Sequence, residues 1–235
     1  MSISTDVVFG TLNSRSDLNL IFTHADKGAP DVHTEYVEVP GREPIDLSEL
    51  IIGYPQYQNR QMRIEFEYVG PEWETEKQLV LAKLHGRKMQ IRFLNDPNWY
   101  YVGRCFVGVA INASTLHFTV NVTAEPYKMA YNETATTLSA AGSVTNPTDF
   151  PSKPLIKVTC TGDGTVTIGN KTITLSDIDG YVMIDSKLMD CYKGLVNMNG
   201  SVQLSEFPKL QPGANNISFT GDVTAVEILG RWVTL

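Results

Sequence analysis

Residues 71–86 read PEWETEKQLVLAKLHG, and the pattern of apolar residues changes directly after them. Trp73, Val80 and Leu84 recur at the spacing that places side chains on one face of a helix. Gly86 suits the left-handed residue that ends many helices, because it has no Cβ to clash. The stretch therefore predicts one short amphipathic helix that stops before residue 87.

Strands are predicted on the C-terminal side of this helix, because apolar and polar residues then alternate with a period of two. The segments with this pattern are residues 89–93, 99–102, 105–112 and 116–124. Gly103 and Gly108 interrupt the apolar positions and are predicted to be β-bulges. The helix and the four segments together predict a helix followed by an antiparallel meander, on which earlier strands such as residues 61–69 can pack.

The second half of the sequence predicts a β-sandwich. Its β-rich segments are residues 155–161, 165–168, 171–175, 181–185, 216–221 and 225–229. Gly169-Asn170 is predicted to be a two-residue hairpin loop, because both residues tolerate positive φ. Asp163-Gly164 is predicted to be a turn that ends one strand before the next begins.

A change in composition divides the 235 residues into two domains. Residues 131–147 are rich in Thr, Ser, Ala and Asn and contain few large apolar side chains. We interpret them as a linker or an extended arm. The predicted domains are therefore residues 1–130 and residues 148–235.

Bulk properties exclude several classes of function. The net charge of −7 differs from the basic footprint of a nucleic-acid-binding domain. No apolar run approaches the ~20 residues that a membrane-spanning helix needs, and the N-terminus has no signal-peptide pattern. Cys105, Cys160 and Cys191 are widely spaced and are predicted to be buried free thiols of a protein made in a reducing cytoplasm.

No catalytic, cofactor-binding or metal-binding residues are assigned from the sequence. The four histidines form no metal-ligand pair at helical spacing. Asp177 and Asp179 precede Gly180, but the other ligands of a calcium loop are missing, so a solvated turn is predicted. We therefore expect a protein that is not an enzyme and carries no cofactor.

The aromatic run Trp99, Tyr100 and Tyr101 has two interpretations. It could be a stacking platform for sugars or bases. It could also be a strand whose alternate rings enter the core while the others cover a subunit interface, and this is the interpretation we favour. The three residues are the candidate subunit-interface residues, and Trp232 is predicted to be a core residue of the sandwich.

Several motifs, taken in their order along the chain, resemble a known family. They are Val39–Arg42, Asp46–Glu49, Asn59-Arg60, Leu84–Gly86, Phe93–Arg104 and Glu125–Lys128. This order resembles the N-terminal domain of the distal tail proteins (Dit) of bacteriophages with long, non-contractile tails. Residues 146–154, 181–185, 212–215 and 226–232 resemble the galectin-like C-terminal domain of the same proteins.

The resemblance implies both a fold and a function. The implied fold is mainly β: a split-barrel-like N-terminal domain with one short α-helix, followed by a galectin-like β-sandwich. The implied protein forms a ring, typically of six copies, at the distal end of the tail tube. Its partners would be further copies of itself, the major tail protein of the tube, the tail-associated tip protein and, in some phages, receptor-binding proteins. DNA would pass through the lumen without specific binding, and no membrane would be involved.

A carbohydrate-binding sandwich that recognises host-wall glycans is the alternative function. Galectin-type sites use a cluster of His, Asn, Arg and Trp on one sheet. From Thr145 onward this chain has no His, and Arg231 is its one Arg. The departure from that pattern favours the tail-ring function.

Overall fold

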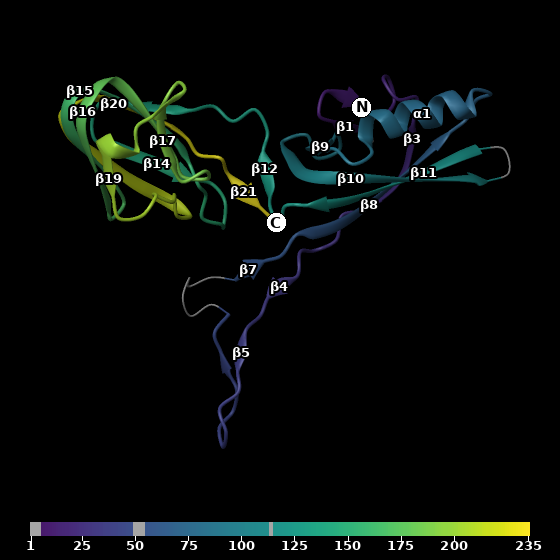
Figure 1. Ribbon diagram of the computed structural model, residues 1–235, viewed down its shortest axis with the longest axis horizontal. Helices are drawn as coiled ribbons and strands as arrows, with labels where there is room; N and C mark the ends of the chain where they lie inside the picture. The colour runs from purple at the N-terminus through teal and green to yellow at the C-terminus, as the bar shows by residue number, and fades with distance from the viewer. Residues whose placement is uncertain (1–5, 49–54, 113–114) are drawn as a thin grey trace. The chain divides into compact units, whose positions relative to one another are not determined.

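The structure is a computed structural model that describes residues 6–48, 55–112 and 115–235. Its contacts separate two compact units, Met1–Lys128 with Leu235, and Met129–Thr234. Both units are built mainly from antiparallel strands (Figure 1). Glu49, the last residue of the family-like motif Asp46–Glu49, lies outside the described residues.

One sheet organises the first unit, and all its neighbouring strands are antiparallel. In spatial order it contains β2 (Leu12–Asn13), β1 (Val7–Phe9), β9 (Lys88–Phe93), β10 (Trp99–Asn112), β11 (Thr115–Ala124), β8 (Arg60–Tyr68) and β3 (Ile21–Asp26). The predicted meander is confirmed with three strands, β9, β10 and β11. The segments 99–102 and 105–112, predicted to be separate strands, form the single strand β10. β1, the first strand of the chain, lies next to β9, and β11 lies next to β8. Segments that are distant in sequence therefore share one core.

The predicted helix is confirmed as α1 (Trp73–Leu84). Val80 and Leu84 are fully buried, and Trp73 packs against the edge of the same core. The N–H of His85 still donates to the carbonyl of Leu81 at 3.0 Å, and Gly86 then adopts φ +75°. A left-handed Gly therefore ends the helix, as its lack of a Cβ allows.

The bulges predicted at Gly103 and Gly108 are wrong. β10 pairs with β11 in one unbroken register through both glycines. A Cβ at Gly103 would lie 2.5 Å from Cγ1 of Val122, so close packing across the strands requires a Gly here. A Cβ at Gly108 would meet its nearest atom, the carbonyl oxygen of Thr119, at 3.7 Å. The two glycines thus differ in their structural role.

The second unit contains one large antiparallel sheet. Its spatial order is β13 (Thr136–Leu138), β20 (Gly213–Leu229), β15 (Leu155–Ile168), β16 (Lys171–Asp185), β17 (Asp190–Lys193) and β18 (Val196–Asn197). β14 (Gly142–Asn146) also pairs with β20, and β19 (Val202–Leu204), which follows the 3-10 turn η1 (Asn199–Ser201), pairs with β16. β12 (Lys128–Ala130), at the boundary of the two units, pairs with β21 (Val233–Thr234) outside this sheet.

β16, one of the longest strands of this sheet, changes the face that it buries along its length. β16 buries Ile173 on one side of Asp177 and Val182 on the other, so the parity of the buried positions changes. Asp177 has φ +54°, which marks the irregularity. Residues from both halves of β16 belong to one core cluster. The predicted β-sandwich is confirmed.

One sequence interpretation is wrong in this unit. Asp163-Gly164, predicted to be a turn between strands, lies inside β15 where the register shifts between Gly162 and Gly164. Residues 131–147, interpreted as a linker or an extended arm, contain β13 and β14, both of which pair with β20. The small and polar composition of this segment suits edge strands that bury few side chains.

The three cysteines are free and buried, as expected. Burial raises the pKa of the Cys105 thiol to about 12, because the thiolate is disfavoured away from water. Among the described residues, no helix is long and apolar enough to cross a membrane.

Candidate interaction surface

A two-stranded arm, residues 31–48 and 55–58, leaves the first unit between β3 and β8 (Figure 1). It contains two short ladders: β4 (Val32–His33) with β7 (Gln56–Tyr57), and β5 (Tyr36–Val37) with β6 (Ile45–Asp46). The N–H of Gln58 donates to the carbonyl of Asp31 at 2.8 Å and closes the base of the arm. Neither ladder belongs to the large sheet of the unit.

Exposed apolar side chains line the arm. Val32 is 45% exposed, Tyr36 is 58% exposed and Ile45 is 40% exposed. None of the arm's described residues belongs to the core cluster of the first unit. An isolated two-stranded ladder is marginal in water, so these side chains gain burial only against another surface.

Acidic residues alternate with the apolar ones along the same arm. They are Asp31, Glu35, Glu38, Glu43 and Asp46, and all five are exposed. Arg42 is the one Lys or Arg among residues 31–48. The arm therefore presents an apolar and negatively charged surface.

A cation cluster, consisting of Lys27, Arg60 and Lys128, lies at the base of the arm. Arg60 is only 4% exposed, its Nε donates to the carbonyl of Pro126 at 2.9 Å, and its guanidinium lies 5.1 Å from the ring centre of Tyr101. Lys27 Nζ lies 4.2 Å from the ring centre of Phe93. Aromatic faces stabilise cations through the negative potential of the π system.

The carboxylate of Asp96 accompanies the three cations. Lys128 Nζ contacts Oδ2 of Asp96 at 3.1 Å, and the same ammonium lies 5.7 Å from the ring centre of Trp99. Burial lowers the pKa of Lys27, the charges of Lys128 and Arg60 lower it further, and Asp96 opposes them. The cluster is therefore an electropositive site with an aromatic floor.

Of the predicted interface residues Trp99, Tyr100 and Tyr101, the first and the third contact the cation cluster. Tyr101 is 4% exposed and packs edge-on against Phe93 at 6.1 Å, so it is a core residue. Trp99 is partly buried beside Lys128, and strand alternation places Tyr100 on the opposite face of β10. Their expected alternation is present, and their role in an interface stays a prediction.

The cation cluster was not found by sequence analysis. Its three residues come from separate segments, before the arm, at the start of β8 and after β11. Asn59-Arg60 was noted only for its resemblance to a family motif. No local spacing signals that these cations meet, because antiparallel pairing over long sequence distances brings them together.

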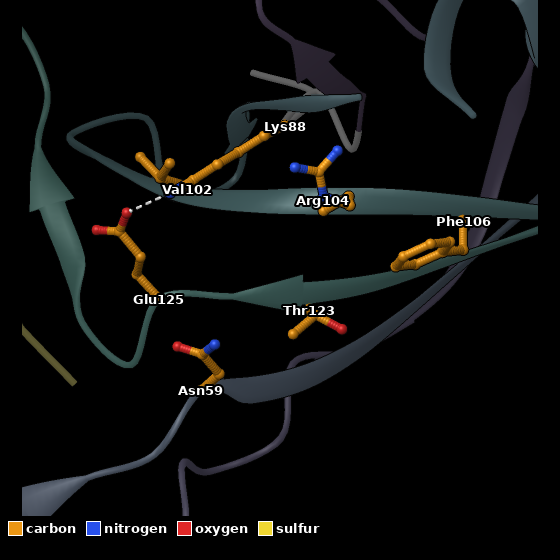
Figure 2. A pocket seen from close by; sticks show the side chains of 7 residues that line it. All are labelled: Asn59, Lys88, Val102, Arg104, Phe106, Thr123 and Glu125. Carbon is orange, nitrogen blue, oxygen red and sulfur yellow. Dashed lines mark hydrogen bonds and ion pairs between the residues drawn. The ribbon is translucent and has the colours of Figure 1, made fainter. Parts of the chain in front are cut away.

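A shallow pocket of about 310 Å³ lies on the polar face of the sheet, between β9, β10 and β11 (Figure 2). On its edge, Lys88 Nζ pairs with Oε1 of Glu125 at 2.9 Å. Arg104 Nη1 donates to the carbonyl of Gly86 at 2.6 Å, and Phe106 is 43% exposed. The pocket combines both signs of charge with one exposed ring, which suits contact with a polar protein surface.

Comparison with known proteins gives a likeness of fold. The sequence matches no family model and no curated protein. Among solved structures, the fold matches that of SPP1 Dit (gp 19.1), described as a paradigm of the hub adsorption apparatus in phages that infect Gram-positive bacteria. The TM-score is 0.74, the identity is 13%, and the match covers 98% of this chain and 99% of that protein.

The match places this chain in a class of mainly β folds. A particular protein with this fold, SPP1 Dit, belongs to the family that the sequence motifs resemble. The resemblance is therefore confirmed at the level of the fold, over nearly the whole chain. At 13% identity, the likeness is one of fold.

Proposed function

We propose that this chain is a structural component of a phage tail, a distal tail protein that forms a ring at the end of the tail tube. The observation that carries the proposal is the fold match over 98% of the chain, which includes both units in one order. A match of this extent is more specific than a shared sandwich or a shared barrel, because each of those folds alone hosts many functions.

The first unit supplies the ring contacts. A closed ring needs a heterologous contact, in which one patch on a subunit meets a different patch on the next. The arm, with its exposed apolar side chains, and the surface around Trp99 to Tyr101 provide two such patches on one unit. We propose six copies in the ring, as in the family that the motifs resemble.

The ring joins the tube to the tip. One face contacts the major tail protein of the tube and the other contacts the tail-associated tip protein, while the second unit is available to receptor-binding proteins. DNA crosses the lumen as a passenger. A chain with a net charge of −7 suits this passage, because it offers phosphates little electrostatic attraction.

Mass measurements test this function. The full chain is studied by light scattering over a concentration series, alone and with the tip protein or tube protein of the same phage. We expect a six-copy species, which forms from the full chain and from residues 1–128 and does not form from residues 129–235. An obligate dimer under every condition, or rings built by residues 129–235 alone, would contradict the proposal.

A further inference from the structure

We propose that the cation cluster of one copy receives the acidic arm of a second copy, so that Lys27, Arg60 and Lys128 bind carboxylates of the neighbouring arm. This inference rests on the proposed ring. It goes further by naming the two surfaces that meet and the chemistry that joins them.

The cation cluster has an excess of positive charge and is partly buried. Arg60 is 4% exposed and carries its charge beside Tyr101 and the carbonyl of Pro126, which are neutral groups. In the described part of the chain, neither Arg60 nor Lys27 forms an ion pair with a carboxylate. Burying a cation without a counter-charge is costly, so a further carboxylate would be favourable here.

Aromatic rings form one side of the cation cluster. Phe93, Tyr101 and Trp99 lie beneath the three cations, and each ring contacts one of them within 6 Å. Such a site can bind a segment of another copy through both charged hydrogen-bond donors and aromatic surface. It therefore fits a segment in which carboxylates alternate with apolar side chains.

The arm is a segment of this kind. Tyr36 and Val37 are exposed on β5, and Glu35 and Glu38 flank them. The arm's own carboxylates form no ion pair with its own cation cluster in the described residues, where Asp96 is the partner of Lys128. A second copy supplies the same arm from outside, and charge complementarity between the two patches sets the direction of the contact.

Such a contact is heterologous, as a ring requires. Each copy gives its arm to one neighbour and receives the arm of the other, so no copy pairs with itself. The arm and the cation cluster adjoin each other within one subunit. The same contact between an arm and a cluster is therefore repeated at every boundary between neighbouring copies. Charge reversal at one patch should therefore weaken assembly without unfolding the unit.

Cross-linking detects the contact directly. Equal amounts of ordinary and ¹⁵N-labelled full-length protein are mixed under assembling conditions and treated with a carbodiimide, which joins amines to carboxylates. We expect peptides of mixed isotope content that link Lys27 or Lys128 to Glu35, Glu38 or Glu43. Rings whose mixed-isotope links all lie elsewhere would overturn the inference.

Paired charge reversals supply a stricter test. Lys27→Glu, and separately Glu35→Lys with Glu38→Lys, should each raise the concentration needed for assembly by about tenfold or more, because like charges then meet. Mixing the two variants should restore assembly. In a ring with an even number of copies the two variants can alternate, so that each reversed arm meets a reversed cluster and each ordinary arm meets an ordinary cluster. Lys153→Glu makes the same charge change at an exposed site in the second unit and serves as the control.

The outcomes separate this inference from the proposed function. Wild-type rings together with unaffected variants would overturn the inference and leave the ring in place. Failure of the mixture to restore assembly, with both variants folded by circular dichroism, would also overturn it. If the cluster cross-links only to the tube or tip protein, the occupant is that partner and the second-copy assignment is wrong. If no ring forms under any condition, both proposals are contradicted.

Discussion

Arg231 and Asp185 form a bidentate ion pair in the second unit, with Nη1 to Oδ1 at 2.7 Å and Nη2 to Oδ2 at 2.9 Å. Asp185 is only 1% exposed, and its Oδ1 also accepts the N–H groups of Lys187 and Leu188. The backbone N–H of Arg231 donates to Glu133 at 2.9 Å. The pair therefore connects the end of β16 to the chain segment after β20.

Breaking this pair should destabilise the second unit strongly. Arg231→Met would leave the Asp185 carboxylate buried without its cation, and we expect a loss of about 3 kcal/mol in the free energy of unfolding. Chemical denaturation of the full chain measures it. Lys171→Met is the control, because the Lys171–Glu206 pair is more exposed and should contribute less than about 1 kcal/mol. Equal effects of the two substitutions would contradict this account.

The same pair predicts a dependence of stability on pH. Burial acts to raise the pKa of Asp185, but the hydrogen bonds from Arg231, Leu188 and Lys187 and the charge of Arg231 outweigh it, so the pKa lies below its ordinary value. A carboxyl group with a depressed folded-state pKa stabilises the protein above the unfolded pKa of about 3.9 and loses this contribution as pH falls through the folded pKa.

Denaturation at several pH values tests this sign. The difference in unfolding free energy between wild type and Asp185→Asn should be largest near neutral pH and should shrink below about pH 4. A difference that grows on acidification would show that the carboxylate is not the stabilising form.

The two glycines of β10 should respond differently to the same substitution. Gly103→Ala places a methyl group against Val122 and the backbone of Ala124, and we expect a cost of about 1–3 kcal/mol from overpacking. Gly108→Ala meets only an ordinary contact and should change stability by less than about 0.5 kcal/mol. Urea midpoints of the two variants provide the comparison, and coincident midpoints would count against the close packing at Gly103.

The second unit should fold alone, and its stability should depend on where the fragment starts. Residues 129–235 retain β13 and β14, including the buried Val144, whereas residues 147–235 lose both strands. We expect cooperative melting of the longer fragment, and a shorter fragment that is less stable by at least about 2 kcal/mol because buried apolar surface is lost. Fragments of equal stability would show that these strands contribute little.

The sequence was informative wherever one local period decided the structure. Leu116 to Ala124 alternate so regularly that every second residue is buried in β11, and Val80 and Leu84 define the buried face of α1. The end of the helix at Gly86 could be predicted because a positive φ depends on the lack of a Cβ at that one residue. Local rules of this kind need no knowledge of the rest of the chain.

Predictions failed where a distant segment decided the structure. Gly103 resembles a bulge glycine in sequence, but a Gly is required there because Val122 on the next strand leaves no room for a Cβ. Gly164 resembles a turn residue, but pairing with β16 and β20 carries β15 through it. The cation cluster shows the same limit, because Lys27, Arg60 and Lys128 meet only after the sheet has formed.

The central claim is that this chain forms a ring at the distal end of a phage tail, and electron cryomicroscopy of intact virions tests it most directly. The account predicts a ring of six copies between the tube and the tip, with the first units in contact around an open lumen and each arm on a neighbouring subunit. Virions that lack this chain, or that carry it in the capsid or along the tube shaft, would contradict the account.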